Sequence, residues 1–260
     1  MAGRLNPPVV AVVSPKGGNG KTTVAVNLAA ALARRSPTVL LDLDVHFGDV
    51  EYALRLHPIV RLNDAVDRLR STPDTDPESF LIQHSSGVAA LCAPGEPIAA
   101  DHLPVAGALS VLDRFLAVER PTVIDTGAGI DDFNLGAVER SGHTVLVTST
   151  DVPSVQAGRK LIDTLAEIAV DPGRLHLAVN RATVDTGLSV ADVEAVLGMS
   201  ASLLIPEDTR IAASMNLGSP LAESMPATPA ARAFQRFADS LLELEMPANR
   251  HRLFSRRSSA

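Results

Sequence analysis

Two lysines, Lys16 and Lys21, stand close together in the glycine-rich segment SPKGGNGKTT. Glycine lets the backbone turn tightly and aim its N–H groups at an anion. A short apolar run precedes the segment and a helical pattern follows it, an order typical of a phosphate-binding loop. We therefore expect the loop to cradle the phosphates of a nucleotide through Gly17, Gly18, Asn19 and Gly20.

The residues that end this loop each have a predicted contact. Lys21 reaches the β- and γ-phosphates, the Thr22 hydroxyl ligates Mg²⁺, and Thr23 meets the α-phosphate. The ordinary pattern, G-x-x-x-x-G-K-[ST], requires glycine at position 15, where this sequence has Pro15. The loop is therefore a variant that carries an additional lysine at position 16.

Lys16 has no evident task within its own subunit, because it lies at the front of the loop. A second subunit docked face to face would receive it beside the γ-phosphate, where a cation supplied in trans is worth about a thousandfold or more in rate. The alternative is a solvated surface lysine. The chain has 20 arginines and only three lysines, which favours a specific role for Lys16.

Short apolar runs alternate with amphipathic helical patterns along the chain. The alternation predicts an α/β fold, with a mostly parallel sheet covered by helices on both faces. Helices are expected at Lys21–Arg35, Val155–Ile168 and Pro229–Leu244. Strands are expected at Val9–Val13, Thr38–Leu43, Val88–Leu91, Thr122–Ile124, Thr144–Thr148, Leu175–Val179 and Ala201–Leu204. The Pro-, Asp- and Ser-rich stretch Arg70–Phe80 is expected to be a surface loop.

Composition and charge favour one domain over residues 1–246, followed by a basic, disordered tail at 247–260. The chain has 260 residues, 46% of them hydrophobic, and a net charge of −7, which disfavours nonspecific DNA binding. The tail carries four arginines around Leu253 and Phe254 and no acidic residue. Weak membrane contact through this tail is an alternative to a solvated tail. The single cysteine fits a cytoplasmic protein.

Several motifs together resemble the ParA/MinD family of ATPases. KGGNGKTT is similar to the family's deviant Walker A motif, and VLLDLD at Val39–Asp44 to its second-strand motif. VIDTGAGID at Val123–Asp131 is similar to its Walker B and switch II, and LAVNRAT and IPEDTRIAASMNLGSPL to its base-binding strand and following loop. The resemblance runs from about Val9 to Leu244. It implies a three-layer P-loop NTPase fold, ATP and Mg²⁺ as ligands, and an ATP-dependent homodimer.

Asp42 and Asp44 stand at the carboxyl end of the second strand, where open α/β sheets bind ligands. Alternation along the strand sends both side chains to the same side. The resemblance implies that Asp44 positions or deprotonates the attacking water and that Asp42 supports the Mg²⁺ shell. A structural role for one of the pair, capping a neighbouring loop, is the alternative.

Asp125 ends another apolar strand, and we expect it to hold Mg²⁺ through water. The segment Gly127–Gly129 then brings a backbone N–H to the γ-phosphate, with Gly129 as the expected contact. Many family members have proline where Gly127 stands, so we expect a more flexible switch here.

Asn180 is the expected adenine reader. A GTPase would carry N-K-x-D at this point, whereas this chain has Asn-Arg-Ala-Thr, which favours ATP. Arg181, Pro206 and Glu207 are expected beside the base.

Within the family, LLDLDVHFGDVEYAL, SSGVAALCAPGEP and TSTDVPSVQAGRKLIDTL look like the CpaE/TadZ branch. That likeness implies a slow, partner-stimulated ATP hydrolase that helps to assemble a Flp/Tad-type pilus, peripheral at the inner membrane face or the cell pole. A MinD- or FlhG-like regulator of the division site or flagella, with the corresponding protein partner, is an alternative. So are a ParA-like DNA partition ATPase and a scaffold that binds nucleotide without turnover.

Overall fold

Eight strands form one sheet in the order β3-β4-β2-β5-β1-β6-β7-β8, and every neighbouring pair is parallel except β3 and β4. The computed structural model describes residues 7–245. The strands are β1 (Val9–Ser14), β2 (Thr38–Leu43), β3 (Ile82–Gln83), β4 (Val88–Leu91), β5 (Thr122–Ala128), β6 (His143–Ser149), β7 (Leu175–Asn180) and β8 (Ala201–Leu204).

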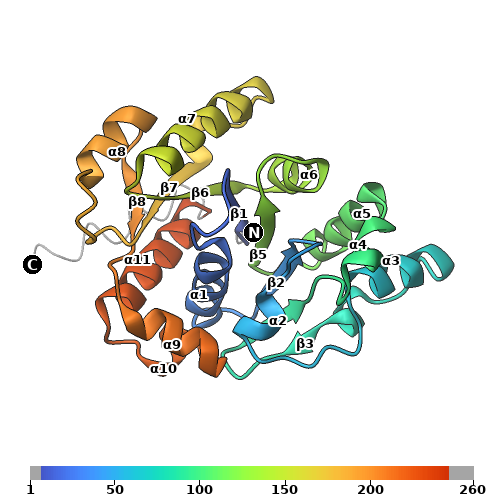
Figure 1. The fold of residues 1–260 in the computed structure, drawn as a ribbon. Helices are drawn as coiled ribbons and strands as arrows, with labels where there is room; N and C mark the ends of the chain where they lie inside the picture. The colour runs from blue at the N-terminus through green and yellow to red at the C-terminus, as the bar shows by residue number, and fades with distance from the viewer. Residues whose placement is uncertain (1–6, 246–260) are drawn as a thin grey trace, which may run out of the picture.

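Helices cover both faces of this sheet, which makes three layers (Figure 1). One face carries α1 (Lys21–Ala33), α2 (Val50–Ala53), α9 (Thr209–Leu217), α10 (Leu221–Ser224) and α11 (Pro229–Leu244). The other carries α3 (Leu62–Ser71), η1 (Pro77–Phe80), α4 (Pro97–Asp101), α5 (Val105–Leu116), α6 (Asp132–Arg140), α7 (Val152–Glu167) and α8 (Val190–Leu197). A short 3-10 turn, η2 (Pro172–Arg174), precedes β7.

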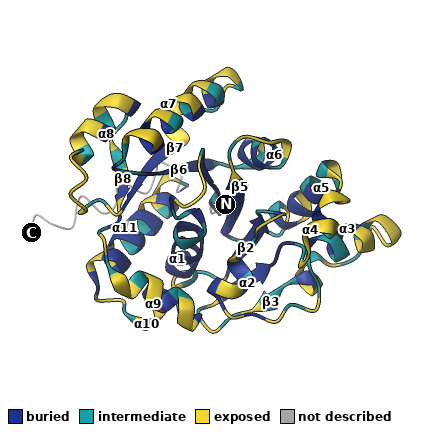
Figure 2. Cartoon of the chain, in the orientation of Figure 1, coloured by how far each residue is buried: buried dark blue, intermediate teal, exposed yellow. Residues whose placement is uncertain are grey.

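The central strand β1 explains why the strands read as nearly continuous apolar runs. Val10 and Val12 pack on the α1 side, whereas Ala11 and Val13 pack on the α7 side. All four are buried, and Figure 2 shows the sheet as the buried layer between more exposed helices. A strand covered on both faces needs apolar side chains at every position.

The predicted fold class is confirmed, and all seven predicted strands are present with ends that differ by four residues or fewer. The stretch Arg70–Phe80 lies at the surface as predicted except for Phe80, but both of its ends are helical. Helix α3 continues to Ser71, and the 3-10 turn η1 ends at Phe80, which is 2% exposed within the core around α5. Asp76 starts this turn by accepting the N–H of Glu78 at 3.0 Å.

The order of the strands fixes where a ligand can bind. From β1 the chain goes to β2 on one side, whereas β6 lies on the other, so the carboxyl end of β1 is the switch point of the sheet. Ligands of open α/β sheets bind at this position. The phosphate-binding segment follows β1 directly and therefore lies there.

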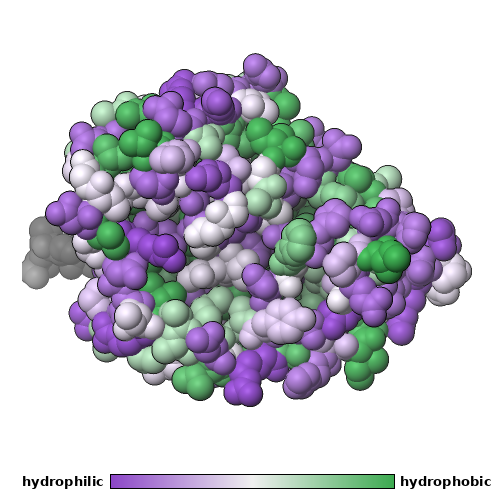
Figure 3. Space-filling model, in the orientation of Figure 1, coloured by the Kyte–Doolittle hydropathy of each residue, from purple (hydrophilic) through white to green (hydrophobic). Residues whose placement is uncertain are grey.

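The surface in Figure 3 carries hydrophobic residues scattered among hydrophilic ones. Between residues 7 and 245 no helix combines the length and the apolar character needed to span a bilayer. The predicted basic tail at 247–260 lies outside the described residues.

Candidate nucleotide site

The phosphate-binding segment joins the end of β1 at Ser14 to the start of α1 at Lys21. Gly18 and Gly20 have φ angles of 84° and 93°, in the left-handed region where a side chain is strained. At Gly20 there is also no space, because a Cβ atom would lie 2.4 Å from Nδ2 of Asn180. Glycine at position 20 is therefore required by both conformation and packing.

Asn19 fixes the shape of this loop from within. Its Nδ2 donates to Oγ of Ser14 at 2.9 Å, and its Oδ1 accepts from Oγ of Ser154 on α7 at 3.1 Å. Its carbonyl oxygen accepts from Nδ2 of Asn180 at 2.9 Å. Asn19 is 6% exposed, so its side chain is committed to the protein, and its expected contact with nucleotide falls to its backbone.

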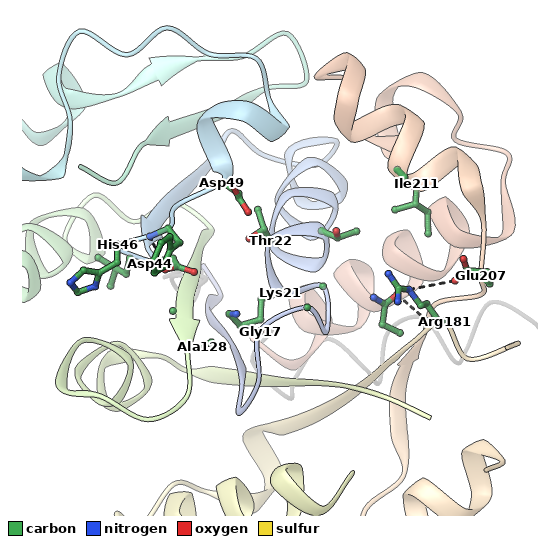
Figure 4. A pocket seen from close by; sticks show the side chains of 18 of the residues that line it. Gly17, Lys21, Thr22, Asp44, His46, Asp49, Ala128, Arg181, Glu207 and Ile211 are labelled. Carbon is green, nitrogen blue, oxygen red and sulfur yellow. Dashed lines mark hydrogen bonds and ion pairs between the residues drawn. The ribbon is translucent and has the colours of Figure 1, made fainter. Parts of the chain in front are cut away.

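A cavity of about 760 Å³ opens above the loop. Lys21 lines this cavity and is only 7% exposed, so the cavity has a buried cation in its lining. The predicted site residues that line it are Gly17, Gly18, Gly20, Lys21, Thr22, Thr23, Asp44, Asn180, Arg181, Pro206 and Glu207. Figure 4 shows Asp44 on one side of Lys21, and Arg181 with Glu207 on the other.

Asp42 lies within β2 and Asp44 directly follows its end, and the two side chains have different surroundings. Asp42 is 1% exposed and accepts the N–H groups of Asp44 at 3.1 Å and Val50 at 3.2 Å. Burial raises the pKa of Asp42 well above its usual range, and the charge of Asp125 adds to this. Asp44 is half-buried and faces the cavity, and burial raises its pKa although Lys21 acts to lower it. Asp42 thus shapes the loop that presents Asp44.

Asp125 pairs with Asp42 in the β2–β5 register and is fully buried. Neither of its carboxylate oxygens accepts a hydrogen bond at normal geometry from a described residue. Burial raises the pKa of Asp125 to about 7, whereas the nearby Thr22 hydroxyl and Lys21 ammonium act to lower it. A buried carboxylate with two unpaired oxygens is not fully compensated by the Lys21 charge.

A divalent cation beside Thr22 would supply the remaining positive charge. No group of three or more His, Cys, Asp or Glu side chains within residues 7–245 is placed to hold a metal by itself. Mg²⁺ does not require such a group, because it typically takes one or two protein ligands together with water and phosphate oxygens. The residues present therefore fit a Mg²⁺ ion that accompanies a nucleotide.

The switch segment after Asp125 is held more firmly than predicted. Gly127 lines the cavity, and its N–H and carbonyl are both bonded by the side chain of Asn134 on α6. The N–H of Gly129 donates to the carbonyl of Ser14 at 3.0 Å. Gly129 adopts φ 90° and does not line the cavity in this conformation. The expected flexibility at Gly127 is thus opposed by Asn134.

The opposite end of the cavity has the residues expected around a base. The Asn180 side chain is bonded at both ends, since its Oδ1 accepts the N–H of Arg181 at 3.0 Å and its Nδ2 reaches Asn19. Nε of Arg181 lies 3.6 Å from Oε2 of Glu207, and the N–H of Glu207 donates to Oγ1 of Thr183 at 3.0 Å. The described contacts of Asn180 are therefore structural, while Arg181 and Glu207 remain exposed to a ligand.

Lys16 is exposed and is not part of the cavity wall. Its charge falls near Asp151 at the start of α7. Burial acts to raise the pKa of Asp151, but hydrogen bonds from Ser149 and Ser154 outweigh this effect, Lys16 adds to them, and the pKa is lowered. Lys16 therefore lies at the surface, outside the cavity of the same chain.

Sequence reasoning missed several residues of this site. His46, Phe47 and Asp49 follow Asp44 in the cavity wall, and the α9 residues Ile211 and Ala212 line the cavity as well. The first three stand within LLDLDVHFGDVEYAL, whose spacing carries no signal of its own for nucleotide binding. Asn134 lies beyond the switch motif, and no spacing rule points to it.

Comparison with known proteins gives a consistent result. A family model described as "CobQ/CobB/MinD/ParA nucleotide binding domain" matches residues 10–221. The septum site-determining protein MinD of Synechocystis is 27% identical over 245 residues, covering 92% of this chain and 91% of that protein.

Two solved structures share the fold. A ParA family ATPase from Chlorobium tepidum superposes with a TM-score of 0.82 at 20% identity, over 89% of this chain and 98% of that one. The MinD protein of Pyrococcus horikoshii, solved with Mg-ADP, gives 0.80 at 20% identity, over 92% and 97%. These two likenesses extend over nearly the whole three-layer architecture.

Proposed function

The chain belongs to the CobQ/CobB/MinD/ParA nucleotide-binding family, and on that premise we propose that it is an ATP hydrolase that dimerises with ATP bound. One observation carries the proposal. Lys21 and Asp44 face the same cavity, and the fully buried Asp125, with two unpaired oxygens, lies close enough to affect and be affected by their charges. A cavity with a buried cation and uncompensated carboxylates suits a magnesium–triphosphate.

Each residue has a proposed role in the reaction. Backbone N–H groups of the loop and Lys21 bind the phosphates, and Asp44, whose pKa is raised by burial, positions the attacking water and receives its proton. Thr22 and Asp125 hold Mg²⁺, and Asp42 supports them by fixing the loop after β2. A Mg²⁺ ion held there would neutralise charge that develops on the phosphates.

Lys16 completes the proposal as a residue that acts in trans. It is exposed and absent from the cavity of its own subunit. In a dimer formed across the cavity mouth, Lys16 of each copy would reach the γ-phosphate bound by the other. Hydrolysis would then remove that contact and release the dimer.

Asp44→Ala tests the hydrolase. We expect the variant to keep ATP binding, to lose turnover by about a hundredfold or more, and to remain a dimer with ATP on a sizing column. Asp74→Ala, in the exposed loop between α3 and η1, is the matched control. An Asp44→Ala variant with normal turnover would refute the role of Asp44.

Two cellular roles follow from different observations. The CpaE/TadZ-like phrases favour assembly of a Flp/Tad-type pilus. The similarity to MinD of Synechocystis favours a regulator of the division site or of a similar machine, and it fits the chain at least as well. In both roles the ATP-bound dimer binds a protein partner at the membrane face or the cell pole.

Deletion of the gene in its own organism separates the two roles. Loss of surface pili with normal septum placement supports the pilus role. Misplaced septa with normal pili support the MinD-like role, and complementation with the Asp44→Ala variant tests whether turnover is needed. A gel shift with ATP at low and moderate salt tests the partition role. The absence of a shift at both salt concentrations would exclude that role.

A further inference from the structure

Asn134 is a buried amide outside every motif, yet it touches the nucleotide-facing loop. It lies in the first turn of α6 and is 3% exposed. Its Oδ1 accepts the N–H of Gly127 at 3.0 Å. Its Nδ2 donates to the carbonyl of Gly127 at 3.3 Å and to that of Gly129 at 3.2 Å. One side chain thus binds three backbone groups of the switch segment.

The position of Asn134 is itself fixed by a hydrogen bond, so its side chain can hold the switch segment Gly127–Gly129 in place. Its backbone N–H donates to Oδ1 of Asp131, which caps α6, at 2.8 Å. The far end of the segment is tied to the phosphate-loop strand, where the N–H of Gly129 donates to the carbonyl of Ser14. Gly127 and Gly129 are therefore held between α6 and β1.

The held segment lies against the group that is proposed to act on water. A Cβ atom on Gly127 would lie 3.7 Å from Oδ1 of Asp44 and 3.7 Å from the amide of Asn134. The space beside the Cα of Gly127 therefore borders both side chains. A shift of this backbone changes the space in front of Asp44.

We propose that Asn134 is a positioning residue for ATP hydrolysis, which sets the backbone of Gly127–Gly129 against Asp44. This inference rests on the proposed hydrolase function. The amide is suited to the task because it accepts one hydrogen bond and donates two in a single plane. A carboxylate at position 134 could accept from Gly127 but would face two carbonyl oxygens without a proton to donate.

The hydrogen bond from the N–H of Gly127 to Asn134 can be removed by a substitution at either residue. Gly127 lies within β5 and does not have a positive φ, so no left-handed backbone excludes proline there, and proline lacks the N–H. Alanine at 127 keeps the N–H and meets only ordinary contacts. Gly127→Ala is therefore the matched comparison for Gly127→Pro.

The experiment measures steady-state ATP hydrolysis by the full chain for Asn134→Ala, Asn134→Asp, Gly127→Ala, Gly127→Pro and the double variant Asn134→Ala/Gly127→Pro. We expect kcat to fall between about tenfold and a hundredfold for Asn134→Ala and for Asn134→Asp, with KM for ATP within about twofold, because misplacement by about 1 Å can cost that much. Gly127→Pro should lose more than Gly127→Ala.

The double variant should be no slower than Asn134→Ala alone, because both changes remove the same hydrogen bond. Asn63→Ala, on α3 outside the cavity, is the control for loss of an asparagine. Thermal melting and ATP binding are measured for each variant. If Asn134→Ala does not fold, Asn134→Asp and the pair of Gly127 variants still decide.

The outcomes separate this inference from the function on which it rests. A wild-type chain without turnover overturns both. A wild-type chain that hydrolyses ATP, with unchanged kcat in the folded Asn134 variants or fully additive losses in the double variant, overturns the role of Asn134 alone. A loss of kcat with retained binding and a non-additive double variant supports it.

Discussion

Two buried polar clusters occupy opposite ends of the central strands. At the carboxyl end, Asp42 and Asp125 lie side by side on β2 and β5 next to Asp44. At the amino end, His143 begins β6 and approaches His176 on β7, beneath the end of α11. Both clusters contain ionisable groups shielded from water. Only in the carboxyl-end cluster does a carboxylate lack a hydrogen-bond partner within the protein.

The amino-end cluster satisfies itself. Nδ1 of His143 lies 3.0 Å from Nε2 of His176, and Nε2 of His143 lies 3.1 Å from Oε1 of Glu245. Arg174 lies 3.3 Å from the same carboxylate oxygen and donates to the carbonyl of Gly142. Burial lowers the pKa of both histidines, that of His176 to about 4. Neutral rings that share hydrogen bonds need no ligand.

The carboxyl-end cluster does not satisfy itself, because both oxygens of Asp125 remain without a donor. An uncompensated buried carboxylate costs stability in the free chain. The contrast shows how burial alone fails to distinguish a structural cluster from a binding site. The distinction comes from which hydrogen-bonding capacity is left over.

The largest expected effect concerns Lys16, which would complete the carboxyl-end site from another copy. We expect Lys16→Ala to keep ATP binding and to lower kcat by about a thousandfold or more, because a cation acting in trans has that effect in phosphoryl transfer. Lys160→Ala, the exposed lysine of α7, is the control. A mixture of Lys16→Ala and Asp44→Ala chains is a second test of action in trans. Unchanged kinetics in Lys16→Ala would show that Lys16 is an ordinary surface lysine.

Asp125→Asn breaks the incomplete cluster. Loss of the charge that balances Mg²⁺ should lower hydrolysis by about a hundredfold to a thousandfold, the range seen for electrostatic contacts in active sites. The same change removes an uncompensated charge, so the melting temperature without nucleotide should stay the same or rise. A less stable variant would contradict the view that Asp125 is unsatisfied in the free chain.

His143→Ala breaks the satisfied cluster, with the opposite pattern. Glu245 and His176 each lose a partner, and we expect a loss of about 2 kcal/mol in the free energy of unfolding. Hydrolysis should persist at temperatures where the variant is folded. His102→Ala, on the exposed end of α4, is the control in thermal melts, and an equal stability of the two variants would contradict the structural role.

The smallest expected effect is a pair of opposed pH dependences. The folded pKa of His176, about 4, lies below the unfolded value near 6.5, so its contribution to stability is lost as pH falls through that window. The folded pKa of Asp125, about 7, lies above its unfolded value of 3.8, so stability without nucleotide is lost as pH rises from 3.8 to 7.

Denaturant unfolding between pH 4 and 6.5 separates the two. Asp125→Asn should leave a stability that rises more steeply with pH than that of the wild type. His176→Asn should leave one that falls more steeply. Parallel curves for all three proteins would show that neither group titrates in this range.

The sequence predicted the sheet well because its strands are covered on both faces and read as apolar runs. It predicted the cavity-lining part of the phosphate loop because glycine and lysine positions there are dictated by backbone geometry. It did not predict η1, since the burial of Phe80, which begins the short apolar run Phe80–Ile82, depends on packing in the core around α5. Asn134 was not predicted for a similar reason, because its hydrogen-bond partners are backbone groups that only the fold brings close to it.

The anchoring of Asn19 bears on the order of events in a nucleotide cycle. Ser14, Ser154 and Asn180 hold this residue from three different elements without any bound ligand. The part of the loop around Asn19 therefore has less conformational freedom to lose when a nucleotide binds. If the chain hydrolyses ATP as proposed, its loop would be ready for the next nucleotide, and the pause between rounds would come from the association of two copies.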